Sequence, residues 1–361
     1  MIYDLIVIGA GAGGLSCAIT ALKRGKKVLV LEKENKLGSK ILISGNGKCN
    51  LSATDVCPKK YNDPDFVAPI LQAEDPLEFY SDIGVMTRTT GNRIYPYSES
   101  ALTVVSKMRA CIPEEVLRTE EVKSILYSDG IYAVGDHRAK AVALCTGSVA
   151  TKGKASYDLY KKFGHDVTAL RPSIVQLKTD TEFIKGLNGL RSKVAISLLS
   201  EGKTVAVEEG EILFRDGGVS GIAVMCLSVF IARDPKKKYV LSVNFIPGEE
   251  QRAKDFCLDG KADGVLHKSI AQAVERYAQK KSIPIDRALT DFRLNVVGLG
   301  RLDQAQVVCG GLETKQFDEF LQSKLSPGLY AAGEVLDVDG ECGGYNLHWA
   351  VASGMRIGKS V

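Results

Sequence analysis

The sequence predicts an α/β fold: a Rossmann-like domain split between both chain ends, an inserted β-barrel-like domain and a small helical segment. Three observations lead to this prediction. Residues 4–32 have the pattern of strand, glycine turn, helix and second strand. Residues 171–247 contain short alternating strands separated by turn residues. Residues 327–354 contain an apolar strand followed by glycines and an amphipathic helix.

The elements of the N-terminal pattern follow from its apolar spacing. Residues 5–8 are an uninterrupted apolar run, as expected for a strand buried on both faces. Apolar side chains recur on one helical face over residues 12–23, which predicts an amphipathic helix. Residues 28–31 form a second apolar run, and Glu32 ends it. The order of elements is that of a βαβ nucleotide-binding unit.

The turn after the first strand matches G-x-G-x-x-G through Gly9, Gly11 and Gly14. The first glycine allows the tight turn, the second lets a pyrophosphate approach, and the third lets the helix pack on the sheet. Glu32 stands where a carboxylate accepts hydrogen bonds from a ribose. The alternative is a glycine-rich helix start that binds nothing. The turn alone leaves NAD and FAD both open.

Composition indicates an ordinary soluble protein of 361 residues, with 45% hydrophobic and 25% charged residues and a net charge of +4. The densest basic run, residues 236–238, is too short to indicate a nucleic-acid surface. Nine cysteines without C-x-x-C and four histidines without H-x-x-x-H argue against disulfides and metal sites. We therefore expect a cytoplasmic protein with no membrane span, and the oligomeric state stays open.

The predicted domains are residues 1–170 with 290–361, residues 171–247, and residues 248–289. The first is the Rossmann-like domain, the second the inserted antiparallel β domain and the third the small helical segment. Further strands are predicted at 91–96, 116–117, 122–127, 131–134, 139–145, 174–178, 194–199, 204–209, 212–214, 239–245 and 329–332. Further helical segments are predicted at 64–79, 98–110, 154–163, 249–281 and 345–357.

Residues 33–55 are predicted to be a long functional loop. Ser44, Gly45, Asn46 and Gly47 indicate a tight turn within it, although a disordered connector is the alternative.

The C-terminal stretch favours FAD over NAD. After a strand, Glu334 and Asp337 can hold sugar-alcohol hydroxyls. A helix that opens at Gly344, Tyr345 and Asn346 would point backbone amides at the N1/O2 side of a flavin, where negative charge develops on reduction.

The chain resembles the HI0933/YhiN-type flavoproteins, also called the BaiN-like or aminoacetone-oxidase family. Three segments carry the resemblance: GAGAGGLSCA with Glu32, SGNGKCNLS at residues 44–52, and AGEVLDVDGECGGYNL at residues 332–347. Weaker similarity at residues 91–101, 145–149, 217–221 and 309–314 follows the family order.

The resemblance implies FAD, with Lys40 in a basic position, Val122 at the adenine, and Thr146 and Gly147 close to the dinucleotide. Residues 45–50 and the helix at Gly344 would approach the flavin ring from two sides. The predicted cofactor-binding residues are Gly9, Gly11, Ala12, Gly13, Gly14, Glu32, Lys33, Lys40, Ser44, Gly45, Gly47, Cys49, Asn50, Val122, Thr146, Gly147, Gly333, Glu334, Asp337, Gly344, Tyr345, Asn346 and Leu347.

The sequence departs from the family pattern near the predicted flavin ring. Asn46 replaces a glycine, Lys48 replaces an arginine, and His348 stands where glutamine is usual. From Ser148 onward the family's second glycine and glycine-rich loop are missing. We expect these changes to affect substrate contacts more than FAD binding.

No catalytic residue is assigned from the sequence. Cys49 can act as a redox thiolate or simply fill space, and we favour the packing role because no partner cysteine stands at C-x-x-C spacing. His348 can donate a proton or only hydrogen-bond in place. Tyr345, Tyr95 and Tyr97 are alternative proton donors.

The predicted function is an FAD-dependent oxidoreductase that exchanges a hydride with a small or medium organic substrate. The resemblance implies either an NAD(P)H-linked reductase of an enone such as a dehydro-bile acid or an amine or aminoketone oxidase using oxygen. We favour the reductase because a cytoplasmic protein with many reduced thiols fits a reducing setting. Gly298-x-Gly300 lacks the third glycine of a second dinucleotide fold, so NAD(P)H would visit the flavin transiently. A flavin-dependent RNA-modification enzyme and a non-enzymatic flavin sensor are alternatives of other classes, and nucleic acid is not the expected partner.

Overall fold

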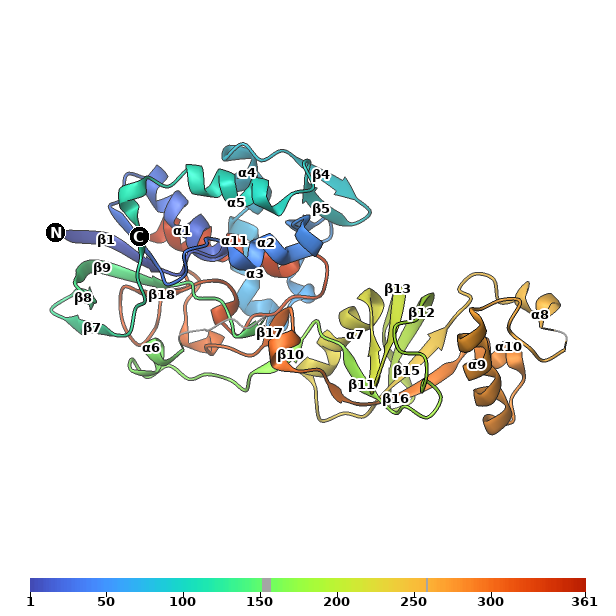
Figure 1. The fold of residues 1–361 in the computed structure, drawn as a ribbon. Coiled ribbons are helices and arrows are strands. Elements are labelled where there is room, and N and C mark those ends of the chain that lie inside the picture. The colour runs from blue at the N-terminus through green and yellow to red at the C-terminus, as the bar shows by residue number, and fades with distance from the viewer. Residues whose placement is uncertain (151–156, 258) are drawn as a thin grey trace. The chain divides into compact units, whose positions relative to one another are not determined.

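The chain divides into two compact units in a computed structural model that describes residues 1–150, 157–257 and 259–361 (Figure 1). Unit 1 comprises Met1–Leu170 and Val307–Val361, and unit 2 comprises Arg171–Gln306.

Unit 1 is built on a seven-stranded sheet of order β6-β2-β1-β9-β8-β7, with β18 also paired to β9. The strand β1 pairs in parallel with β2 and β9, and β18 pairs in parallel with β9. Both ends of the chain therefore build one sheet, which confirms the predicted split Rossmann-like fold. The strands are β1 (Ile2–Ile8), β2 (Val28–Glu32), β6 (Leu117–Thr119), β7 (Ile125–Ser128), β8 (Ile131–Val134), β9 (His137–Leu144) and β18 (Leu329–Ala331).

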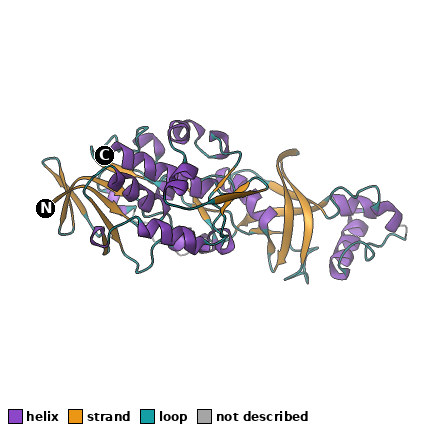
Figure 2. Cartoon of the chain, turned by 90° about the horizontal axis from the view of Figure 1, so that it is seen from above, coloured by secondary structure: helices purple, strands orange, loops and turns teal. Residues whose placement is uncertain are grey.

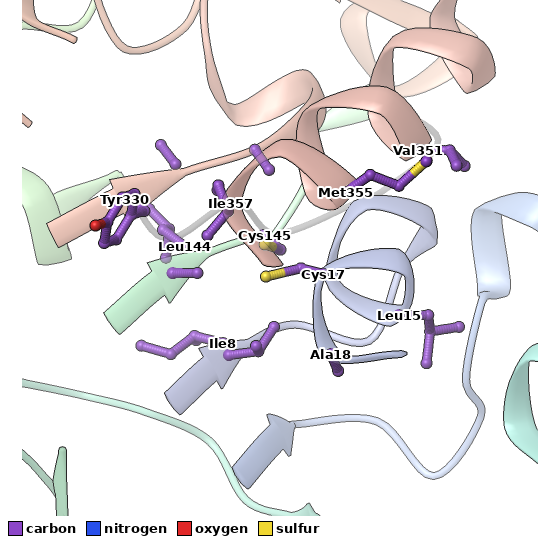
Figure 3. Packing of buried hydrophobic residues seen from close by; sticks show 14 of the residues in the cluster. Ile8, Leu15, Cys17, Ala18, Leu144, Cys145, Tyr330, Val351, Met355 and Ile357 are labelled. Atoms are coloured by element: carbon purple, nitrogen blue, oxygen red, sulfur yellow. The ribbon is translucent and has the colours of Figure 1, made fainter. Parts of the chain in front are cut away.

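Helices α1 (Ala12–Lys23) and α11 (Tyr345–Ser360) lie side by side in unit 1 (Figure 3). Their approach depends on small residues, since a Cβ on Gly354 would lie only 2.1 Å from the Gly13 carbonyl oxygen. The Ser16 hydroxyl also donates across the contact to the Val351 carbonyl (3.2 Å). The first and last helices of the chain are thus locked together, and both begin at the carboxyl ends of sheet strands.

The other elements of unit 1 surround this sheet. A small sheet of order β3-β5-β4 consists of β3 (Ser52–Ala53), β4 (Thr87–Thr90) and β5 (Arg93–Pro96). The helices are α2 (Ser39–Ile43), α3 (Pro64–Ala73), α4 (Pro76–Asp82), α5 (Ala101–Ala110) and α6 (Asp158–Lys161). A short strand, β17 (Val307–Cys309), begins where the chain returns from unit 2 to unit 1.

Unit 2 contains a closed six-stranded barrel of order β11-β14-β13-β12-β15-β16, whose strands are orange in Figure 2. The predicted barrel-like domain is therefore confirmed. The strands are β11 (Leu177–Thr179), β12 (Arg191–Ser200), β13 (Lys203–Arg215), β14 (Gly218–Ser220), β15 (Tyr239–Asn244) and β16 (Phe292–Leu299), preceded by β10 (Arg171–Ser173). The helices are α7 (Ile222–Arg233), α8 (Ala253–Phe256), α9 (Lys268–Lys281) and α10 (Ile285–Thr290).

The structure differs from the predicted organisation at residues 290–306, which belong to unit 2. The reason is β16, which closes the barrel by pairing with β11 and β15. The helical residues 248–289 belong to the same unit, because α9 and α10 contribute Ile270, Val274 and Leu289 to the barrel's apolar core.

Several element predictions need correction. Residues 222–233 form α7 rather than a strand region, and an apolar run of this length suits a buried helix better than a short strand. The two strands expected at 204–209 and 212–214 are one strand, β13. The loop expected at residues 33–55 contains α2 and β3. Residues 154–156 of the helix expected at 154–163 lie outside the described residues, and α6 covers its centre.

Candidate functional site

The glycine turn after β1 has the conformation that a phosphate cradle needs. Gly9 has φ +101°, and a Cβ there would lie 2.5 Å from the Cys145 carbonyl oxygen. A Cβ on Gly14 would lie 1.9 Å from the Gly9 carbonyl oxygen, so only glycine lets α1 start this close to the turn. A Cβ on Gly11, in contrast, would point into open space, which leaves room for a ligand.

Glu32 fixes this turn from the end of β2. Its Oε2 accepts a hydrogen bond from the Ala10 amide (2.7 Å), and its Oε1 accepts one from the Glu34 amide (3.0 Å). Each carboxylate oxygen keeps further acceptor capacity for a ribose hydroxyl. The carboxylate is thus placed to organise the turn as well as to meet a sugar. Lys33 follows it as a half-buried residue.

A polar cluster lies beside the glycine turn, after β9 and β18. Lys40 Nζ donates to the Ser148 hydroxyl (2.9 Å) and forms an ion pair with Glu334 Oε2 (2.9 Å). Glu334 Oε1 accepts from the Val308 amide (2.9 Å). A Cβ on Gly147 would lie 3.7 Å from Lys40 Nζ, so Gly147 belongs to the same cluster. The structure therefore brings Lys40, Gly147 and Glu334 together.

Asp337 and Gly333 are held by the protein itself. Asp337 Oδ2 accepts from the Thr168 hydroxyl (2.7 Å), and its Oδ1 accepts from Asn62 Nδ2 (3.1 Å). The Gly333 amide donates to the Ser353 hydroxyl (2.9 Å), and Trp349 Nε1 donates to the Gly333 carbonyl (3.2 Å). These contacts fix the chain between β18 and α11.

The SGNGKCN segment, residues 44–50, lies against the start of α11. A Cβ on Gly344 would lie 2.6 Å from the Ser52 carbonyl oxygen and 2.9 Å from Asn50 Oδ1. Asn346 clamps the loop before the helix, because its side chain accepts from the Gly340 amide (2.8 Å) and donates to the Gly340 carbonyl (2.9 Å). Asn50 Oδ1 is buried and has no partner in the described part of the chain. This junction therefore contains one buried hydrogen-bond acceptor, Asn50 Oδ1, to which no described residue donates.

His348 joins the same junction through Ser52, whose hydroxyl lies 2.8 Å from His348 Nδ1. The imidazole is buried, and burial lowers the pKa of His348 to about 4 despite the opposing charge of Asp75. At neutral pH the ring is therefore uncharged, and the imidazolium form is too scarce to act as the general acid.

Burial also decides the chemistry of Cys49. It raises the pKa of the Cys49 thiol to about 11, so the thiolate that a redox relay needs is scarce at neutral pH. Cys49 has φ +61° and no exposed surface. These facts favour the packing role.

The three tyrosines proposed as proton donors lie in different surroundings. The Tyr345 hydroxyl donates to Asp55 Oδ1 (2.7 Å), and burial raises its pKa. Tyr97 is exposed beneath the Arg88 guanidinium. Tyr95, on β5, lies against the SGNGKCN segment, since its Cε1 is 3.7 Å from the position of a Cβ on Gly45. Tyr95 is therefore the tyrosine best placed to face a flavin ring at this junction.

The remaining predicted residues lie in several elements. Ala12 and Gly13 are in the first turn of α1, and Leu347 is in the first turn of α11. Ser44, Gly45 and Gly47 are in the short 3-10 helix Ser44–Gly47. Thr146 contacts the glycine turn, since its Cα is 3.1 Å from the position of a Cβ on Gly9. Val122 lies half-buried before β7, which begins only at Ile125.

The described residues fit FAD at its diphosphate and at its flavin ring. Neither α1 nor α11 has, in the part of the chain that the structure describes, a side-chain cap or an acidic residue in its first turn. Their first amides and their dipoles therefore suit a diphosphate at α1 and the N1/O2 side of a flavin at α11. The buried Asn50 oxygen suits a flavin or substrate N–H.

Two contributors were missed by the sequence argument. Ser52 binds His348, and Ser353 holds the Gly333 amide. Ser353 is a hydroxyl residue in an otherwise apolar stretch, which was an available signal, whereas Ser52 stands among polar residues and gave none. Over residues 1–150, 157–257 and 259–361, no cluster of His, Cys, Asp or Glu is arranged to hold a metal ion. Within those residues no helix combines the length and the apolar character that a membrane crossing requires.

Comparisons with known proteins find relatives along almost the whole chain. The chain is 29% identical to the 3-dehydro-bile acid delta(4,6)-reductase of Clostridium scindens, with 98% of each chain covered. It is 27% identical to the ribosomal RNA dihydrouridine synthase of Escherichia coli, over 97% of this chain and 96% of that protein.

The fold is also that of a solved flavoenzyme. The 3-ketosteroid delta1-dehydrogenase of Sterolibacterium denitrificans superposes with a TM-score of 0.53 at 14% identity, and 99% of each chain is covered. The family model of the HI0933-like protein Rossmann domain matches residues 3–360. The chain therefore belongs to the HI0933-like family and is an FAD-dependent oxidoreductase.

Proposed function

We propose that the chain is a reductase that saturates a carbon–carbon double bond conjugated to a carbonyl group, with NAD(P)H as transient reductant of FAD. The observation that carries this proposal is the shared chemistry in the names of two relatives. A 3-dehydro-bile acid delta(4,6)-reductase acts on double bonds conjugated to a 3-oxo group. Dihydrouridine is uridine saturated at C5–C6, a bond conjugated to the C4 carbonyl.

The electronic demand is the same in both cases. The carbonyl withdraws electrons, so the distant alkene carbon accepts a hydride and the carbon next to the carbonyl then takes a proton. FAD, when bound, would supply the hydride after a reductant has reduced it. The protein has to hold the acceptor beside the flavin and provide the proton.

The junction of the SGNGKCN segment and α11 suits these tasks. The α11 amides provide a positive end for charge that develops at the flavin or at the carbonyl oxygen. Cys49 has no exposed surface, which favours its packing role, and His348 carries no positive charge near pH 7. We assign the proton to Tyr95, because it lies against Gly45 at this junction.

The sheet topology supports a transient role for NAD(P)H. The G-x-G-x-x-G turn follows β1, whose strand neighbours are parallel to it, whereas Gly298 lies in the barrel strand β16. A nicotinamide would therefore have to reach the flavin and leave again.

For the substrate we favour a small or medium enone of the dehydro-bile-acid type, acted on in the cytoplasm. The 98% coverage of the reductase supports this choice. A uridine in ribosomal RNA is the second candidate, because the similarity to the dihydrouridine synthase covers 97% of this chain at nearly the same identity. An amine or aminoketone oxidase remains the alternative within the oxidoreductases.

The test is a panel of acceptors with NADH and NADPH: a 3-oxo-Δ4 steroid acid, ribosomal RNA transcribed in vitro, and oxygen with an amino ketone. The proposal expects saturated steroid product, or dihydrouridine in digested RNA, at the expense of a nicotinamide. Oxidation of the amino ketone by oxygen, without either product, would reject it. Tyr95→Phe is expected to slow the saturation step, whereas the exposed Tyr97→Phe is the matched control and is expected to leave it unchanged.

A further inference from the structure

Two buried tyrosines, Tyr157 and Tyr160, stand three residues apart at the start of α6 and have opposite hydrogen-bond status. The Tyr160 hydroxyl accepts from the Leu144 amide on β9 (3.1 Å) and donates to the Tyr330 carbonyl on β18. It thereby joins the two strands where they meet. The Tyr157 hydroxyl is equally removed from solvent, with the residue 7% exposed, yet it has no partner among the described residues.

The Tyr157 hydroxyl lies near the polar cluster at the carboxyl ends of β9 and β18. The charges of Glu334 and Asp337 are close enough to act on it, and together with burial, the larger cause, they raise its pKa. Those carboxylates already accept from Lys40, the Val308 amide, Thr168 and Asn62. Tyr157 is therefore a protonated donor beside acceptors that are in use.

An unpartnered buried donor at this position calls for a ligand atom. Buried hydroxyls in folded proteins nearly always have a partner, because losing water without a replacement is costly. Ligands of open α/β sheets bind at the carboxyl ends of the strands, where Gly9, Thr146 and Gly333 also lie. The alternative is that Tyr157 is simply buried in an apolar core, but the charges of Glu334 and Asp337 beside it argue against that alternative.

We propose that Tyr157 donates its hydroxyl proton to an oxygen of the ribityl–diphosphate linker of FAD. This assignment rests on the binding of FAD by unit 1. Tyr157 lies outside the sequence segments from which the cofactor site was predicted. It would be a binding residue that the glycine turn, the SGNGKCN segment and α11 do not include.

The experiment compares Tyr157→Phe with Tyr160→Phe and with Tyr127→Phe, whose ring is 40% exposed on β7. Each full-length protein is stripped of flavin and titrated with FAD, with flavin fluorescence as the signal. Loss of one hydrogen bond to a charged or polar ligand oxygen predicts a dissociation constant about 10- to 100-fold higher for Tyr157→Phe. Tyr127→Phe is expected to bind as the unmodified chain does.

Thermal unfolding without flavin separates ligand binding from folding. Tyr157→Phe removes a hydroxyl that has no partner among the described residues, so its midpoint is expected to equal or exceed that of the unmodified chain. Tyr160→Phe leaves the Leu144 amide without its acceptor and is expected to unfold at lower temperature. Tyr160→Phe is thus expected to lower the midpoint of thermal unfolding, whereas Tyr157→Phe is not.

The outcomes are distinguishable. If the unmodified chain binds FAD and Tyr157→Phe binds it equally well, the assignment of Tyr157 is overturned while the flavin site stands. A flavin-free Tyr157→Phe that unfolds earlier than the unmodified chain would also overturn it, because the hydroxyl would then have a structural partner. Failure of the unmodified chain to take up FAD would refute the cofactor itself.

Discussion

The buried His348 makes the stability of unit 1 depend on pH in a way that one substitution should remove. Its pKa in the folded chain is about 4, against an ordinary value of 6.5 for histidine. The unfolded chain therefore binds a proton first as the pH falls. Stability from this source is fully present above pH 6.5, declines below it, and stops declining below about pH 4.

The magnitude follows from these two pKa values. Between about pH 7.5 and pH 5, the protonation of His348 in the unfolded chain lowers the free energy of unfolding by about 2 kcal/mol. Because the residue is only 8% exposed, solvent screening does not reduce this figure much. In His348→Gln, which retains a polar group near Ser52, this contribution disappears.

Trp349 provides the assay. It is the one tryptophan of the chain, and it is buried in α11 directly after His348, so its fluorescence reports the unfolding of unit 1. Urea unfolding of both flavin-free proteins near pH 7.5 and pH 5 gives four free energies. The unmodified chain is expected to lose about 2 kcal/mol more than His348→Gln between the two pH values. Equal losses would show that His348 titrates normally, and the reasoning would be refuted.

Three further predictions concern the same unit. Gly354→Ala places a Cβ 2.1 Å from the Gly13 carbonyl oxygen and is expected to cost at least about 1–3 kcal/mol in the urea assay; unchanged stability would contradict the close contact of α1 and α11. Ser353→Ala removes the acceptor of the Gly333 amide and is expected to cost about 1–3 kcal/mol, and a loss within error would disprove that role. Cys49→Ser is expected to leave the rate of flavin reduction by NAD(P)H within about twofold, because the thiol, with a pKa of about 11, carries little thiolate; a large loss would restore the redox role.

The cofactor cradle was predictable because its signals are local. The helix expected over residues 12–23 is α1 with the same bounds, since the glycine turn and the apolar period define both of its ends. The strand and helix near the C-terminus followed from the same kind of pattern. The resemblance implied that residues 45–50 and Gly344 approach the flavin ring from two sides, and it did not predict the close approach of Gly344 to Asn50 that the structure shows.

Other features could not be predicted from local sequence patterns, because they depend on contacts between distant residues or leave no periodic signal. The partners of Asp337 are Thr168 and Asn62, which are distant in sequence, and no spacing rule links them. The helix α7 was missed because an uninterrupted apolar run has no visible period. The barrel strand β16 was assigned to the wrong unit for a similar reason, because strand pairing across the barrel is a long-range property.

The most direct test of the central claim is to follow flavin absorbance in the purified holoenzyme without oxygen. The account predicts that NADH or NADPH bleaches the bound flavin, and that a compound with an alkene conjugated to a carbonyl, either a 3-oxo-Δ4 steroid acid or uridine in ribosomal RNA, restores the colour. A flavin that no nicotinamide bleaches, or that only oxygen restores after bleaching by an amine, would contradict it.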